Sequence, residues 1–238
     1  MARRRLLSSC MGIIGASILE LSCTLNNPNI LDDVNYRYNY FESVNLDSAY
    51  YSKIVDWQRR VTKEGSLDLV VLNKVNSNNA IGKYNLLNDY MHYLDEIKNE
   101  RYKGVYQQVE NFSRWFQEMS IIYFVHDGNG NTDMDYWETF GETLSTNGDD
   151  CDGLSNIPYD FLQRIGISKE EVYKGILRKD SERHMVILWF DRKDNPLVID
   201  PTGASTKKVK RLSELIPLWI PERVFSEDKS YNVGRINH

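Results

Sequence analysis

Residues 172–199, VYKGILRKDSERHMVILWFDRKDNPLVI, contain three short apolar runs that decide the fold class. The runs cover Val172–Arg178, Met185–Phe190 and Leu197–Ile199, and their length and composition predict strands. Asp194-Asn195-Pro196 is a typical turn between the last two runs. Because strands joined by so short a turn pair antiparallel, we expect this part of the chain to build a small antiparallel sheet.

The chain before these runs has helical periodicity. Apolar residues recur at three- and four-residue spacing after Asp47 and Ser48, which are suitable helix caps: Tyr50, Ile54, Trp57 and Val61. Gly65 ends this first helix, and Leu67–Val75 predicts a second, shorter one. A third helical region spans residues 86–119, with a break near Gly104.

The boundary between the helices and the strands is more complex. Residues 121–127, IIYFVHD, either end the third helical region or form a strand. Residues 154–165 have a helical pattern, in which Pro158 must kink or restart the helix. Helices followed by antiparallel strands predict an α+β domain.

Composition limits the domain count and the class of partner. The 238 residues are 41% hydrophobic and 26% charged, which suits one or at most two globular domains. We assign residues 47–225 to one domain, with a helical part at 47–118 and a core at 119–225, and residues 226–238 to a tail. A net charge of −5 implies no basic face, so the sequence argues against a nucleic-acid partner.

The N-terminus has the pattern of an export signal. Arg3-Arg4-Arg5 precedes a short apolar run, Leu6–Leu21, which is interrupted by Glu20 and is too short for a membrane-spanning helix. Cys23 closes residues 1–23 in the manner of a lipoprotein processing site, so a lipid anchor at this cysteine and a plain export signal are alternatives. Residues 24–46 are polar and aperiodic and are interpreted as a tether. We therefore expect an exported protein of the periplasm or envelope, which contacts the membrane only through this segment.

Only one cysteine, Cys151, lies outside the predicted signal. The three cysteines are Cys10, Cys23 and Cys151, and the first two lie in or at the end of the predicted signal. The exported product would hold no disulfide pair within its folded domain. A lone thiol outside the cytosol is exposed to oxidation, so Cys151 is expected to be either buried or used.

The surroundings of Cys151 suggest a nucleophile. It opens a predicted helix after Asn147-Gly148-Asp149-Asp150, where backbone N–H groups favour negative charge on sulfur. Of the four histidines, His184 stands at the head of the strand run HMVILWF, and Asp200 follows the next run. Antiparallel pairing of these strands would bring Asp200 close to His184. The order cysteine, histidine, aspartate supplies the nucleophile, base and orienting group of a thiol enzyme.

Several motifs around this order are similar to those of a known family. The segments DYWETFGETLSTNGDDCDGLSNIPYDFLQRIGI, RHMVILW and PLVIDPTG resemble the bacterial transglutaminase-like cysteine peptidases. The resemblance covers roughly residues 112–205. The matching positions include these residues: Trp137, Thr139, Glu142, Leu144, Asp150, Cys151, His184 and Asp200.

The resemblance implies a papain-like or transglutaminase-like α+β fold, with the nucleophile at a helix N-terminus packed on a small antiparallel sheet. It implies that Cys151 is the nucleophile, His184 the general base and acid, and Asp200 the group that orients the imidazole. Trp137, Thr139 and Glu142 would line the substrate-binding surface or support it. The sequence departs from the family at Gly153, where the family has an acidic residue.

Two candidate calcium sites accompany the resemblance, although no cofactor is required. Asp150 and Asp152 flank the cysteine, and acids at these positions hold calcium in some members of the family. Upstream, a twelve-residue loop has calcium-binding spacing, but Thr132 stands where the turn needs glycine. The ligand positions of that loop are Asp127, Asn129, Asn131, Asp133, Asp135 and Glu138. For both candidates the alternative is a solvated polar surface.

Three functions remain open from the sequence. The first is an exported thiol hydrolase that cleaves a peptide or isopeptide bond in an envelope protein through an acyl-enzyme. The second is transfer of the acyl group to an amine, as transglutaminases do. The third is a non-catalytic binding protein that has kept the fold.

Overall fold

The computed structural model describes residues 37–43, 50–65, 85–98, 104–125 and 136–236. The chain divides into two units, Met1–Asn35 and Tyr36–His238, and only the second contains described residues. The predicted export signal and the predicted short helix at Leu67–Val75 therefore lie outside the described residues.

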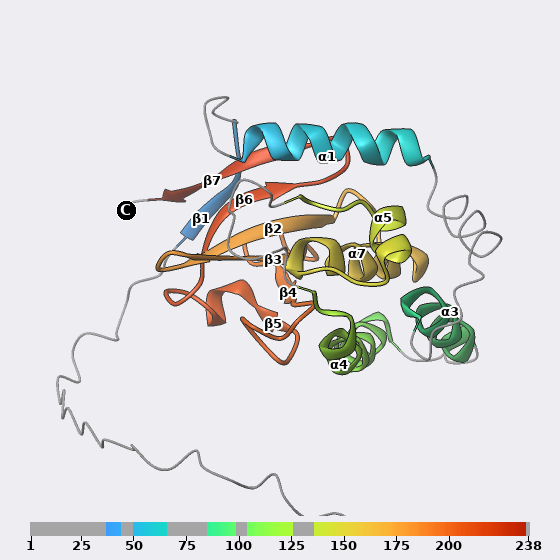
Figure 1. Ribbon diagram of the computed structural model, residues 1–238. Helices are drawn as coiled ribbons and strands as arrows, with labels where there is room; N and C mark the ends of the chain where they lie inside the picture. Colours follow the sequence, from blue (N-terminus) through green and yellow to red (C-terminus); the bar gives the residue numbers. More distant parts are fainter. Residues whose placement is uncertain (1–36, 44–49, 66–84, 99–103, 126–135, 237–238) are drawn as a thin grey trace, which may run out of the picture. The chain divides into compact units, whose positions relative to one another are not determined.

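The described residues of the second unit form a seven-stranded antiparallel sheet in the order β1-β7-β6-β2-β3-β4-β5 (Figure 1). The strands are β1 (Arg37–Glu42), β2 (Val172–Lys179), β3 (Glu182–Trp189), β4 (Leu197–Ile199), β5 (Lys210–Arg211), β6 (Ile220–Phe225) and β7 (Ser230–Ile236). The three strands predicted from residues 172–199 are confirmed as β2, β3 and β4, which occupy adjacent positions.

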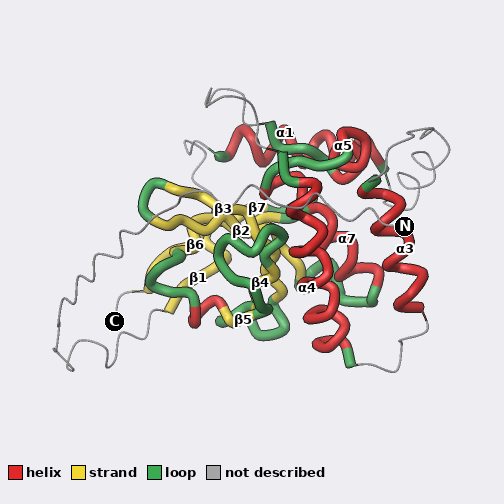
Figure 2. Tube along the Cα trace, turned by 60° about the horizontal axis from the view of Figure 1, so that its bottom comes forward, coloured by secondary structure: helices red, strands yellow, loops and turns green. Residues whose placement is uncertain are grey.

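Six α-helices are described, and Figure 2 shows them gathered beside the sheet. They are α1 (Tyr51–Glu64), α3 (Leu86–Ile97), α4 (Val105–Tyr123), α5 (Phe140–Thr146), α6 (Cys151–Leu154) and α7 (Asn156–Arg164), and a 3-10 turn, η4 (Leu212–Glu214), follows β5. The predicted break near Gly104 is confirmed, because α3 ends at Ile97 and α4 starts at Val105. Residues 121–123 end α4 rather than forming a strand. None of the described helices combines the length and the apolar character needed to cross a membrane.

Alternation along β3 divides the core into clusters on the two faces of the sheet. Ile187 and Trp189 pack with α3, α4 and α7 in the largest cluster, which includes the stacked rings of Phe112 and Phe161. Val186 and Leu188 point to the other face and pack with residues of β1, β6 and the η4 region. This period of two is what a strand buried on both faces requires.

A third cluster fixes α1 over the sheet, and we call it the α1 cluster. Ile54 and Trp57 of α1 pack with Trp137 and with three residues of the sheet: Ile176, Met185 and Phe225. The positions of Ile54 and Trp57 agree with the predicted apolar stripe of this helix. Gly65 has a φ of 83° at the end of α1, in the left-handed region that glycine adopts readily, which agrees with its predicted role as a helix stop.

The sheet is larger than the sequence predicted, and two assignments need correction. β1 lies within residues 24–46, which were interpreted as a tether, and β7 lies within residues 226–238, which were interpreted as a tail. β7 pairs with both β6 and β1. The tether interpretation missed the buried positions of Tyr38 and Tyr40, which alternate with exposed Asn39. Polar residues between aromatic ones thus form an edge strand here.

Candidate active site around Cys151

The loop before Cys151 is held against the end of α4. The Asp149 N–H donates to the Tyr123 carbonyl and the Val125 N–H donates to the Asp149 carbonyl, both at 3.1 Å. Gly148, with φ of 138°, is required here because a Cβ would lie 2.2 Å from the Tyr123 carbonyl oxygen. This backbone pairing fixes the position from which α6 starts.

Cys151 is the first residue of α6, as the sequence predicted. The Asp150 side chain caps the helix by accepting from the Asp152 N–H at 3.1 Å. α6 ends at Leu154, and α7 restarts at Asn156, which places Pro158 in the first turn of α7. A proline in that turn costs no intrahelical hydrogen bond, so Pro158 leaves α6 undisturbed.

The Cys151 sulfur contacts the sheet directly. Its Sγ accepts from the Met185 backbone N–H at 3.5 Å, and its side chain packs against the α1 cluster. Burial raises the pKa of the Cys151 thiol well above its usual value, and the neighbouring Asp150 carboxylate adds to this effect. The Met185 N–H acts in the opposite direction, because it stabilises a thiolate. The resting sulfur is therefore a protonated thiol whose proton must be removed before it can attack.

His184, near the start of β3, and Asp200, directly after the end of β4, form a buried pair. The His184 Nε2 lies 2.8 Å from the Asp200 Oδ1, and the two residues are 6% and 1% exposed. Antiparallel pairing of β3 with β4, with Ile187 opposite Ile199, brings the start of β3 near the end of β4. The predicted proximity of His184 and Asp200 is therefore confirmed. The ring of Trp219 covers the imidazole, with the ring centroids 5.8 Å apart.

Asp200 is held by its own loop as well as by His184. Its carboxylate accepts hydrogen bonds from three backbone N–H groups of residues 202–205 and from the Ser205 hydroxyl, at 2.6–2.9 Å. Burial alone would raise the pKa of Asp200, but the hydrogen bonds from His184 and Ser205 outweigh burial, and the pKa lies well below its usual value. Gln117 of α4 fixes the loop by donating to the Asp200 and Thr206 carbonyls. Asp200 is therefore an ionised, fixed acceptor for the imidazole.

The sulfur and the histidine–aspartate pair are both bonded to the start of β3. Met185, whose N–H contacts the Cys151 sulfur, is the residue that follows His184 in β3. The Met185 N–H follows the His184 residue directly along the chain, so one short segment of β3 holds both the sulfur and the imidazole. The three residues proposed from the sequence are thus joined through one strand.

Trp137, Thr139 and Glu142 support the segment that precedes Cys151. Thr139 and Glu142 form a capping box at the start of α5, in which the Thr139 N–H donates to the Glu142 carboxylate at 2.8 Å. Glu142 also forms an ion pair with Arg60 of α1. Trp137 stacks between Tyr50 and Phe225, with centroid distances of 5.9 and 5.7 Å. These contacts tie α1 to α5 and make one wall of the α1 cluster.

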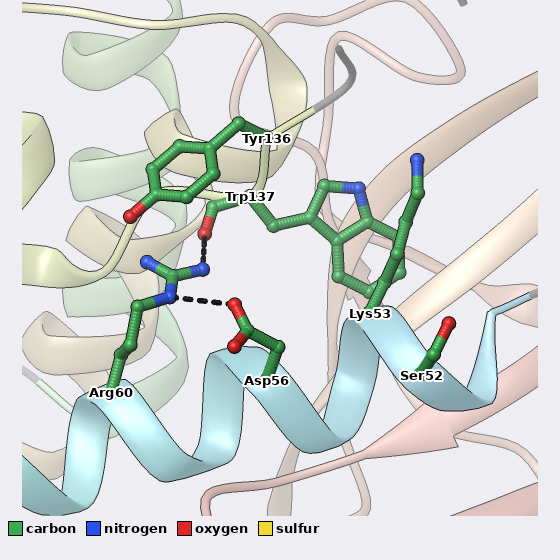
Figure 3. A pocket seen from close by; sticks show the side chains of 6 residues that line it. All are labelled: Ser52, Lys53, Asp56, Arg60, Tyr136 and Trp137. Atoms are coloured by element: carbon green, nitrogen blue, oxygen red, sulfur yellow. Dashed lines mark hydrogen bonds and ion pairs between the residues drawn. The ribbon is translucent and has the colours of Figure 1, made fainter. Parts of the chain in front are cut away.

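A surface pocket is formed by α1 together with Tyr136 and Trp137, and Figure 3 shows its lining. Its walls are bonded to each other, because Arg60 donates to Asp56 at 2.9 Å and to the Trp137 carbonyl at 2.6 Å. Cys151, His184 and Asp200 do not line it. This pocket is therefore not the place where the sulfur would meet a substrate.

Three carboxylates gather beside Cys151, and only two of them were predicted as metal ligands. Asp149, Asp150 and Asp152 each offer an oxygen, and these atoms lie within 4.8 Å of one another. Asp149 and Asp152 are 4% and 3% exposed, and Asp149 Oδ2 and Asp152 Oδ1 have no hydrogen-bond partner. Burial raises the pKa of Asp149 to about 7 and raises that of Asp152 well above its usual value. Oxygen-rich groups with unused lone pairs are the ligands that calcium prefers.

Gly153 departs from the resembled family for a visible reason. A Cβ at this position would lie 2.0 Å from Asp149 Oδ2. The glycine therefore makes room for the Asp149 carboxylate, which folds over the first turn of α6. The glycine at position 153 is thus explained by the packing of the acid cluster.

A buried lysine faces this cluster, and the sequence analysis did not single it out. Lys174 of β2 is 1% exposed, its Nζ donates to the Asp152 carbonyl at 3.0 Å, and it lies 4.6 Å from the centroid of the Trp57 ring. Burial lowers the pKa of Lys174 to about 7, while Asp152 and Asp149 oppose that shift. In the run VYKGIL a lysine looks like a solvent-facing residue of an alternating strand, so no local signal marks it.

The second predicted calcium site stays a prediction. Asp127, Asn129, Asn131, Asp133 and Asp135 lie outside the described residues. Glu138, the last ligand position, accepts from the Thr146 hydroxyl at 3.0 Å, and its carbonyl accepts from Trp57 and Asn156. These contacts place Glu138 in the support of α5 and α7.

Comparisons with known proteins give the fold. No protein-family model matches the sequence, and the comparison with curated proteins found no match. Two solved structures of Legionella pneumophila LapG, one of them EGTA-treated, match with a TM-score of 0.50 at 18% identity. They cover 75% of this chain and 87% and 84% of the LapG chains. A calcium-bound LapG structure matches with a TM-score of 0.49 at 17% identity. The similarity confirms the expected papain-like, transglutaminase-like α+β fold, and at this identity it shows the fold alone.

Proposed function

We propose that this protein is an exported thiol hydrolase that cleaves a peptide or isopeptide bond in a protein substrate. One observation carries the proposal: a buried histidine–aspartate pair includes His184 of β3, and the next residue of that strand, Met185, donates its backbone N–H to the Cys151 sulfur. A purely structural cysteine has no use for an ionised aspartate that is locked onto a neighbouring imidazole. The transglutaminase-like fold is compatible with this chemistry but does not by itself establish it.

In the proposed reaction, His184 takes the proton of the Cys151 thiol while the sulfur attacks the substrate carbonyl. Because Nε2 is bound to Asp200, the other ring nitrogen, Nδ1, is the one available to exchange the proton. The imidazolium then gives that proton to the leaving amine, and a thioester remains on Cys151. Water, activated by His184, hydrolyses the thioester and restores the thiol.

Backbone geometry supports the oxyanion in this scheme. The Cys151 N–H belongs to the first turn of a helix, where N–H groups have no intrahelical acceptor. Such a group can donate to the oxygen of a tetrahedral intermediate formed at the adjacent sulfur. Asp200 keeps the imidazole oriented and stabilises the imidazolium, because its own charge is fixed by the loop of residues 202–205.

A calcium ion, where it binds, would be held by Asp149, Asp150 and Asp152. The two buried carboxylate oxygens without partners support this assignment. The ion would supply positive charge that offsets three carboxylates next to a sulfur which must become negative during attack. Export follows from the signal pattern at residues 1–23, so the proposed substrate is a protein of the periplasm or envelope.

The test compares the full chain with its Cys151→Ala and Cys151→Ser variants in cells that export it. We expect both variants to lose turnover by a factor of about 10⁴ or more, since the nucleophile is absent. Mass spectrometry of new protein termini in the envelope fraction identifies the cleaved substrate. Ser145→Ala, a change on α5 outside the proposed triad, is the matched control and should keep the wild-type cleavage pattern.

The product distinguishes the possible outcomes. New termini that disappear in both cysteine variants support the hydrolase, whereas cross-linked proteins that disappear in both variants identify acyl transfer to an amine instead. The same termini and cross-links in wild type and in both variants would show that the cysteine does no chemistry and would leave a binding protein.

A further inference from the structure

The Lys174 ammonium lies inside the fold, next to the acid cluster of Asp149, Asp150 and Asp152. It has a single hydrogen bond, to the Asp152 carbonyl, and the face of Trp57 on another side. An ammonium has three donors and is costly to bury without compensating charge. The carboxylates of Asp152 and Asp149 are the acids that stabilise its charged form.

The acid cluster, in turn, requires positive charge or protons near its carboxylates. It brings three carboxylates together, two of them buried, and two oxygens of the buried pair have no hydrogen-bond partner. Like charges at such short separation are unfavourable unless a cation or a proton compensates them. The distances among the oxygens suit a calcium ion, whose ligands lie roughly 2.3–2.6 Å from the metal.

Lys174 and a bound divalent cation would therefore both neutralise negative charge of the same three carboxylates. An ion bound by the carboxylates would lie in the field of the buried ammonium, and water does not screen charges well at such a site. The lysine is held by the chain and stays beside the cluster when the ion arrives. In its charged form it repels the ion and lowers the affinity of the cluster for that ion.

We propose that Lys174 is the built-in counter-ion of the Asp149–Asp150–Asp152 cluster and that its positive charge limits the affinity of this cluster for calcium. The acid cluster then keeps its shape without a metal and binds calcium only at high free concentration. This role concerns the architecture of the cluster, and it holds whether or not Cys151 is a nucleophile.

The test measures calcium binding by isothermal titration calorimetry of the full chain after treatment with EGTA and dialysis. Lys174→Met keeps the length and the apolar part of the side chain and removes the charge. We expect this variant to bind calcium at least about tenfold more tightly than wild type does. Lys174→Arg keeps the charge and should stay near the wild-type affinity. Lys193→Met, an exposed lysine in the β3–β4 turn, is the control for the loss of one positive charge.

Thermal unfolding gives a second readout that does not depend on catalysis. Ligands that bind only the folded state raise its melting temperature according to their affinity, so calcium should raise that of Lys174→Met more than that of wild type. A variant that unfolds without calcium should refold when calcium is added. An affinity of Lys174→Met equal to or weaker than wild type, or a variant that stays unfolded in calcium, would overturn the proposal.

Discussion

Asp200 shows how one carboxylate is kept ionised in the interior. Removing a charged group from water is expensive, yet this side chain is 1% exposed and its pKa is lowered. Four backbone N–H groups and two hydroxyls of its own loop, together with His184, replace the lost water. Because each bond favours the ionised form, the loop of residues 202–205 and the imidazole are held in place by the same charge.

Replacing Asp200 with asparagine should therefore weaken the fold in a pH-dependent way. At pH 7 we expect Asp200→Asn to lower the free energy of unfolding by about 2–3 kcal/mol, the range for hydrogen bonds to a charged group. Because the pKa of Asp200 is lower in the folded state than in the unfolded state, its ionisation stabilises the fold. This stabilisation is complete at pH values above the unfolded-state pKa of about 3.9, and it is lost as the pH falls below that value toward the folded-state pKa. The difference between variant and wild type should thus narrow by about 1 kcal/mol when the pH is lowered to about 3.

Urea unfolding at both pH values measures this difference. Asp194→Asn, an exposed carboxylate in the β3–β4 turn, is the control and should change stability little at either pH. A difference between Asp200→Asn and wild type that stays constant across this range would show that the carboxylate does not carry the charge described here.

Single residues also show where sequence reasoning stops. Cys151, His184 and Asp200 could be proposed because each stands at the end of a recognisable apolar or glycine-rich segment. Asp149 was not proposed, since its inward position depends on the backbone pairing with residues 123–125 and on the space left by Gly153. Lys174 lies among apolar residues of β2, and the packing of α6 and of Trp57 of α1 around its ammonium makes it an interior charge.

Among the elements, the three strands with continuous apolar runs were predictable and the other four strands were not. β2, β3 and β4 are buried, and a buried strand reads as an unbroken apolar run. β1 lies at one edge of the sheet, beside β7, and an edge strand tolerates polar residues and lysine or arginine, which discourage pairing with other chains. The pairing of β1 with β7 depends on partners nearly two hundred residues apart, for example Tyr38 opposite Arg235, which no local pattern reveals.

β1 should contribute measurably to stability, although it lies in a stretch that reads as a tether. A chain that starts at Ser43 lacks Tyr38 and Tyr40, two buried tyrosines, and leaves β7 as an open edge. We expect it to be less stable by at least about 3 kcal/mol than a chain that starts at Tyr36, as for the loss of a large buried aromatic side chain. Denaturant unfolding of the two purified chains makes the comparison. Equal stabilities would mean that β1 contributes nothing to the fold.

At the scale of the folded unit, β3 connects every part of the core. Met185 belongs to the α1 cluster beside Cys151, Ile187 and Trp189 belong to the helical cluster, and Val186 and Leu188 belong to the cluster on the opposite face. A strand that contributes to all three clusters cannot leave one of them without disturbing the others, because interiors are closely packed. The candidate site therefore stands on a strand that all three clusters share.

This sharing predicts that the described unit unfolds in one transition. Tryptophans report on each cluster separately: Trp57 and Trp137 in the α1 cluster, Trp189 in the helical cluster and Trp219 on the opposite face. We expect urea midpoints from tryptophan fluorescence and from far-ultraviolet circular dichroism to coincide, as two-state unfolding requires. Trp57→Phe and Trp219→Phe, which each remove one reporter, should still give coincident curves from the two methods. A fluorescence midpoint that differs from the circular-dichroism midpoint in wild type but coincides with it in Trp219→Phe would show that the cluster reported by Trp219 unfolds independently of the rest.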